Sequence, residues 1–142
     1  TRSLVNEIAL REAIARGDEA WEERIVLAFH RMMRARRRGQ APDAELERAH
    51  RAFHAALIAA CGSRWITGFS ETLFDCARRY RSLAINARAE ERDIEGEHRQ
   101  IMDAVLARDT PLAVTLLNRH IALTAEIVTR LDALQKAADA VE

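Results

Sequence analysis

Apolar residues recur every three or four positions along almost the whole chain, which is the spacing that gathers them on one face of an α-helix. Runs of β-branched residues are absent, and only five glycines and two prolines interrupt the pattern. Such a sequence predicts an all-α fold. The predicted helices cover about residues 2–15, 18–38, 42–62, 63–87, 90–108 and 109–138.

The ends of these segments carry residues that are typical of helix termini. Gly17 ends the first segment, and Asp18 follows as the N-cap of the second, because its side chain can accept a hydrogen bond from the free N–H groups of the first turn. Ser63 is expected to cap the fourth helix, and Asp109 or Thr110 the last. The connections are short, so we expect an antiparallel bundle of about six helices.

One apolar stripe of each helix is expected to face the core. The apolar positions are Leu4, Ile8 and Ile14 in the first helix, Trp21, Ile25, Leu27 or Ala28, and Met32 in the second, and Ile66, Phe69, Leu73, Ala77, Tyr80 and Ala84 in the fourth. Cys61 and Cys76 lie among apolar helical residues and form no metal-ligand spacing. We therefore interpret them as buried, reduced thiols.

The composition fits one globular domain over residues 1–142, with 49% hydrophobic and 31% charged residues. Basic and acidic residues number 22 each, so the chain has no net field that would attract DNA or an anionic membrane. No apolar run approaches the ~20 residues that a membrane-spanning helix needs, and no signal-like segment precedes the first helix. We expect a cytoplasmic location.

Four of the five histidines fall on the predicted buried faces of their helices. His50 and His54 lie one turn apart on the third helix, and His98 and His120 lie on the fifth and sixth. Each buried imidazole has a donor and an acceptor to satisfy, and one divalent cation would satisfy four rings at once. We predict a shared divalent-metal site, with zinc or nickel as the first candidates; the alternative is four separate core histidines. His30 has no such neighbour and is interpreted as structural.

Two Glu-x-x-His units, Glu47 with His50 and Glu95 with His98, favour a different site, the di-iron centre of carboxylate bundles. Such a centre also needs a bridging glutamate from each of two further helices, and the fourth and sixth helices offer none convincingly. It leaves the other two histidines unexplained. We prefer the histidine site and keep an oxidase-like metalloenzyme as the alternative function. A helical dimerisation module without metal is the third.

Three segments carry a resemblance to a known family. Residues 49–57, 97–109 and 118–121 read AHRAFHAAL, EHRQIMDAVLARD and NRHI. With these segments, nearly the whole chain resembles the FCD domain, the C-terminal effector-binding domain of the FadR subfamily of GntR transcriptional regulators. The resemblance implies a regulatory domain without catalytic residues.

The resemblance also implies a divalent metal, which in that family is usually held by one aspartate and three histidines. His54, His98 and His120 match the three histidines, whereas His50 stands where aspartate is usual. This departure removes a negative ligand, so it leaves the metal's identity open. A more cationic site should hold an anionic effector better.

Effectors of the family are commonly small carboxylates that reach the metal and a nearby arginine. Arg81 is the first candidate for that arginine and Arg78 the second, because guanidinium suits bidentate carboxylate binding. The resemblance further implies a homodimer. Operator DNA would be bound only through an N-terminal winged helix that this chain does not contain.

Overall fold

The computed structural model describes the backbone of residues 1–38, 44–78 and 93–139, with the side chains of these residues except at 127, 128 and 130–139. Its helices are α1 (Arg2–Arg16), α2 (Glu19–Arg38), α3 (Ala44–Ile58), α4 (Arg64–Cys76), α6 (Ile94–Leu106) and α7 (Thr110–Asp139). The predicted all-α bundle is confirmed.

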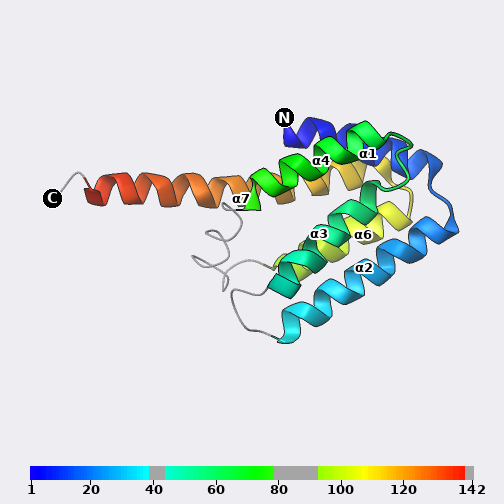
Figure 1. The fold of residues 1–142 in the computed structure, drawn as a ribbon, viewed down its shortest axis with the longest axis horizontal. Coiled ribbons are helices and arrows are strands. Elements are labelled where there is room, and N and C mark those ends of the chain that lie inside the picture. The colour runs from blue at the N-terminus through cyan, green and yellow to red at the C-terminus, as the bar shows by residue number, and fades with distance from the viewer. Residues whose placement is uncertain (39–43, 79–92, 140–142) are drawn as a thin grey trace.

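The helices form two layers (Figure 1). One layer contains α1, α4 and α7, and the other contains α2, α3 and α6. Contacts of α3 with α1 and α4, and of α6 with α7, join the layers. The C-terminal part of α7 extends beyond the bundle in Figure 1.

A single apolar cluster fills the space between the helices. Its largest fully buried hydrophobic members are Trp21, Phe53, Leu10, Ile25, Met32, Leu57, Ile101, Leu117 and Val105. They come from α1, α2, α3, α6 and α7, so burial of these side chains holds both layers together. Within the described residues, no helix combines the length and the apolarity needed to cross a membrane.

The predicted helix ends are found at or near the expected residues. The Asp18 carboxylate accepts a hydrogen bond from the backbone N–H of Trp21 at 2.8 Å, and Ser63 caps α4 through the N–H of Ile66. Of the two candidates for the last helix, Asp109 accepts a hydrogen bond from the first turn at 3.1 Å. Caps of this kind satisfy N–H groups that have no partner inside the helix.

The buried face of α1 differs from the predicted one, whereas α2 buries Trp21, Ile25 and Met32 as predicted, with Ala28 rather than Leu27 packed against the core. Leu4 and Ile8 are exposed, and so is Leu27. The buried residues are Asn6, Ala9, Leu10, Ala13 and Ile14 in α1, and Trp21, Ile25, Phe29, Met32, Met33 and Ala35 in α2.

α4 ends at Cys76, whereas the fourth predicted helix continued to about residue 87, and residues 79–87 of that continuation lie outside the described residues. Its buried residues are Ser70 and Phe74, whereas Phe69 is exposed. Cys61 is buried as predicted, but the prediction for Cys76 was wrong, since this thiol is exposed. The stripe positions Tyr80 and Ala84 lie outside the described residues.

Candidate metal centre

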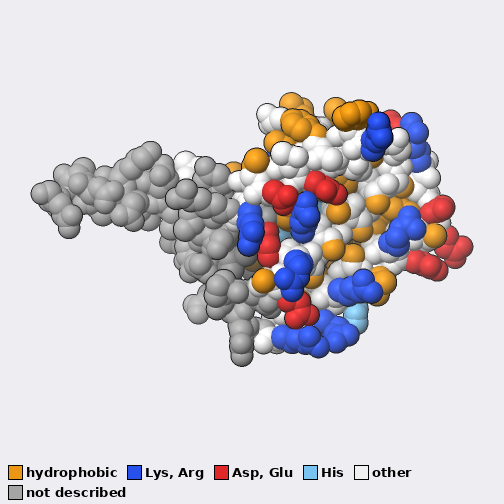
Figure 2. Space-filling view, in the orientation of Figure 1, with side chains coloured by type: hydrophobic (Ala, Val, Ile, Leu, Met, Phe, Trp, Pro, Cys, Tyr) orange, Lys and Arg blue, Asp and Glu red, His pale blue; other side chains and the backbone are white. Residues whose placement is uncertain are grey.

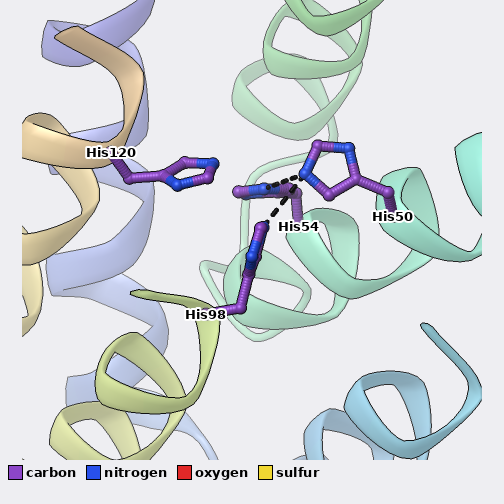
Figure 3. A group of neighbouring side chains, drawn as sticks. All are labelled: His50, His54, His98 and His120. Carbon is purple, nitrogen blue, oxygen red and sulfur yellow. Dashed lines mark hydrogen bonds between the residues drawn. The ribbon is translucent and has the colours of Figure 1, made fainter. Parts of the chain in front are cut away.

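Three helices bring the four predicted histidines together between the two layers. His50 and His54 come from α3, His98 from α6 and His120 from α7. Figure 3 shows the four rings pointing toward one another. The i, i+4 spacing on α3 places two rings on the same face of that helix. The predicted convergence of the four imidazoles is therefore present.

The ring nitrogens lie at the distances expected of ligands around one ion. The Nε2 atom of His50 is 3.0 Å from Nε2 of His98 and 3.0 Å from Nε2 of His54. One ligand atom from each of the four rings lies within 4.8 Å of the others. Zinc–nitrogen bonds of about 2.0–2.1 Å in a tetrahedron separate neighbouring nitrogens by about 3.3 Å. A small shift of the side chains would thus fit a divalent ion.

Two of the rings are held in the tautomer that a metal requires. Nδ1 of His98 donates to the carbonyl oxygen of Ile94 at 2.6 Å, and Nδ1 of His120 lies 2.8 Å from Oε2 of Glu97. Because these oxygens can only accept, both Nδ1 atoms carry the proton. The Nε2 lone pairs are then available to a cation, as in most histidine metal sites.

Burial favours the neutral form of His54. His54, His98 and His120 are 9%, 1% and 6% exposed. The pKa of His54 is lowered well below its ordinary value of 6.5, first by burial and then by the neighbouring rings of His50, His120 and His98 and by Arg2. A neutral imidazole has a free lone pair, so the depressed pKa of His54 favours metal binding over protonation.

Aromatic side chains form the walls of the site. The Phe74 ring lies 5.5 Å from the His50 ring and 5.6 Å from the His54 ring, and Phe53 lies 5.5 Å from His98, between ring centroids. These apolar walls exclude water and lower the local dielectric. A bound cation would therefore interact strongly with any anion that reaches it.

The acidic residues of the di-iron alternative do not join the cluster. Among the described residues, the group of close ligand atoms contains the four histidines and no carboxylate. Glu95 instead lies 3.2 Å from Arg99 and 4.0 Å from Arg37 in partly exposed ion pairs. The described ligands thus lack the carboxylates that bridge two irons.

The predicted arginines have different outcomes. Arg78 is an exposed residue just beyond α4, and Arg81 lies outside the described residues. Sequence reasoning missed Arg2 and Arg51, which line a cavity of about 20 Å³ together with His54. Arg51 directly follows a predicted ligand in the sequence, which was an available signal. Arg2 offered none, because its position depends on how α1 packs.

His30 is exposed on α2 and lies outside the histidine cluster. The interpretation of His30 as a structural residue is not supported by this exposed position. An exposed imidazole on the surface of α2 has no packing role comparable to that of the buried rings. His30 therefore provides a matched control for substitutions in the cluster.

Comparison with known proteins supplies the family. The model of the FCD domain family matches residues 1–123. The uncharacterized HTH-type transcriptional regulator BphR of Paraburkholderia xenovorans is 34% identical over 139 residues, which cover 95% of this chain and 57% of that protein. The HTH-type transcriptional repressor GlaR of Escherichia coli is 33% identical over 130 residues, which cover 84% of this chain and 57% of that protein.

A crystal structure of a GntR family transcriptional regulator from Pseudomonas syringae shares the fold. It aligns with a TM-score of 0.79 at 18% sequence identity, covering 97% of this chain and 56% of that one. The chain thus spans a little more than half the length of the proteins it matches. At this identity, the structural likeness concerns the fold alone.

Proposed function

The chain belongs to the FCD domain family, and from this premise we propose that it is the ligand-sensing domain of a GntR-type transcriptional regulator that binds one divalent metal through His50, His54, His98 and His120. The observation that carries the proposal is the convergence of four imidazoles, three of them buried, with ligand atoms within 4.8 Å of one another. Four imidazoles turned toward one another form a ligand set that a single divalent ion can bind at once.

Zinc and nickel are the metals that this ligand set favours. Four neutral imidazoles suit borderline ions such as zinc, nickel and copper better than magnesium or calcium, which prefer oxygen ligands. With His50 in the position where the family usually has aspartate, no ligand neutralises the ion. When bound, the metal supplies a double positive charge to an anion entering the site.

We propose that this anion is a small carboxylate and that Arg51 binds it. The buried Nε of Arg51 has no hydrogen-bond partner within the described part of the chain, and Arg51 lines the cavity beside His54 together with Arg2. The Nη2 atom of Arg51 pairs with exposed Asp75 at 3.0 Å. Exposed pairs of this kind contribute about 0–1 kcal/mol, so a carboxylate can displace Asp75. Arg78 and Arg81 remain predicted contacts for a longer effector.

The cavity limits how the effector enters. A volume of about 20 Å³ holds roughly one water molecule, so a carboxylate must push side chains apart. Movement of Arg51 on α3 and Phe74 on α4, which also lines the cavity, would couple effector binding to the packing of the two layers. Such coupling could shift the arrangement of attached DNA-binding domains. These domains would lie in the remaining part of the protein, which we place in the cytoplasm.

We expect no turnover from this chain. The relatives that it matches are transcriptional regulators, and the described ligand cluster has no carboxylate. Neither observation favours the oxidase-like alternative. A metal at this site would organise the effector pocket.

Adding succinate should raise the melting temperature of the zinc-loaded protein by several degrees and leave the EDTA-treated protein unchanged. A ligand at 100 times its Kd stabilises the native state by about 2.7 kcal/mol. Arg51→Gln should reduce the succinate shift, whereas Arg48→Gln, at an exposed site one turn earlier on α3, should not. Differential scanning fluorimetry measures all four cases. An equal shift with and without zinc would contradict the proposed role of the metal.

We also propose that the domain forms a homodimer through α1 and α4, two helices that pack together. Leu4 and Ile8 lie one turn apart on α1 and are 68% and 54% exposed, while Trp65 and Phe69 on α4 are 76% and 50% exposed. Figure 2 shows hydrophobic side chains gathered on this edge. Exposed apolar patches mark interaction surfaces, and a second copy fits because helix-turn-helix regulators commonly bind two half-sites as dimers.

Trp65→Glu should convert the dimer into a folded monomer. A charge replaces an aromatic side chain that is 76% exposed in one chain, so the fold itself loses little while the interface loses an apolar contact and gains an unpaired charge. Leu27→Glu on α2, at a site with 48% exposure, is the control and should remain dimeric. Sedimentation velocity distinguishes the species. A variant Trp65→Glu that sediments as a dimer would exclude this interface.

A further inference from the structure

The two most buried histidines of the cluster, His98 and His120, differ in the partner that their Nδ1 atom contacts. Nδ1 of His98 donates to the backbone carbonyl oxygen of Ile94, one turn earlier on the same helix. Nδ1 of His120 instead lies 2.8 Å from Oε2 of Glu97, a side chain of another helix, α6. The hydrogen bond to Nδ1 of His98 is therefore local to α6, whereas the one to Nδ1 of His120 links two helices.

Glu97 and His98 are consecutive residues of α6, so their side chains diverge by about 100° around the helix axis. This divergence lets His98 enter the cluster while Glu97 reaches across to α7 and contacts Nδ1 of His120. The Glu97 and His120 side chains are 22% and 8% exposed. A hydrogen bond to a carboxylate is strong in such partly buried surroundings.

We propose that Glu97 is a positioning residue of the metal centre. By accepting the Nδ1 proton of His120, it fixes the tautomer and the orientation of that ring, so that Nε2 presents its lone pair to the cluster. This inference rests on the proposed metal site. It gives the site one negative charge adjacent to a ligand, which the four histidines themselves lack.

The position of Glu97 also makes the proposal testable without loss of the fold. Glu97 and His120 line a cavity of about 240 Å³ between α6 and α7 that is also lined by Arg119 and Asp93. Shortening Glu97 therefore enlarges an existing space rather than opening a void in the apolar core, which is the costly case.

The experiment compares Glu97→Ala, Glu97→Gln and the control Glu95→Ala in the full chain. Glu95 lies on the same helix and pairs with Arg99 at 3.2 Å. Proton–nitrogen correlation spectra of histidine-labelled, metal-free protein report the tautomer of each ring. Competition with a chelator gives the Kd for zinc.

In the wild type and in Glu95→Ala, His120 should carry its proton on Nδ1. In Glu97→Ala, the proton should be found on Nε2 in part of the molecules, and the Kd for zinc should rise by about 10–100-fold, as for other outer-shell partners of metal-bound histidines. Glu97→Gln retains an acceptor oxygen, so it should restore the tautomer and part of the affinity.

An unchanged His120 tautomer in Glu97→Ala, with a Kd within twofold of the wild type, would overturn the proposal even if the wild type binds zinc. If the wild type bound no zinc, the proposed function would fail. The tautomer measurement on metal-free protein would still decide whether Glu97 positions His120. The two failures are therefore distinguishable.

Discussion

Replacing both His54 and His98 with alanine should abolish stoichiometric zinc binding. The wild type should bind one zinc ion per chain, whereas the double variant retains only His50 and His120 near the site and should lose affinity by more than about 100-fold, beyond the 10–100-fold typical of an outer-shell partner. His98 is 1% exposed and its Nδ1 atom is held by the backbone, so no neighbouring side chain can take its place. Elemental analysis after dialysis and chelator competition measure the loss.

The control for this variant is His30→Ala, which removes an exposed histidine from α2 and should leave zinc content and affinity unchanged. Circular dichroism of the metal-free proteins should show the same helix content, because His54 and His98 are not members of the apolar cluster that holds the helices together. Wild-type zinc affinity in the double variant would show that the cluster is not the binding site. Loss of zinc on His30→Ala would indicate surface chelation instead.

The histidine site could be predicted because its geometry is mostly local. The pair at i and i+4 on α3 shares a face in any α-helix, and His98 and His120 fall on the apolar stripes of helices whose limits were predicted nearly correctly. The unusual residue type at those buried positions marked them as functional. Convergence then required only that the three helices pack against one core.

The contacts that support the site could not be predicted in the same way. Asn6 on α1 and Ser70 on α4 are both buried and hydrogen-bonded to each other. Considered within its own helix, each is a polar residue that would not be expected in the core. Glu97 likewise gains its role only when α6 packs on α7. These interactions depend on tertiary packing, because each partner is satisfied by a residue far away in the sequence.

The same limit explains the error in α1. Leu4 and Ile8 are exposed, whereas Leu10 and Ile14 are buried together with Ala9 and Ala13. α1 packs against α3, α4 and α7, and these neighbours determine which of its apolar residues are buried. The sequence of α1 contains more apolar residues than one face can bury, so tertiary packing determines which of them reach the core.

Replacing Trp21 with alanine should have the largest effect on folding. The Trp21 side chain is 0% exposed, and its Nε1–H donates to the carbonyl oxygen of Ala56 on α3 at 2.9 Å. Truncation of a buried Trp typically costs about 3–5 kcal/mol, which for a chain of this length lowers the melting temperature by on the order of 10 °C. Thermal unfolding of metal-free protein at a fixed concentration measures the shift.

Trp21→Phe separates the two contributions of this side chain. It retains most of the buried ring but lacks the N–H donor, so it should lose less stability than Trp21→Ala. Trp21 lies on α2, whereas all four proposed ligands come from α3, α6 and α7. Zinc should therefore still bind the folded Trp21→Ala protein with nearly wild-type affinity and raise its melting temperature. A Kd for zinc that rose as the melting temperature fell would instead mean that α2 positions the histidines through Ala56, two residues from His54.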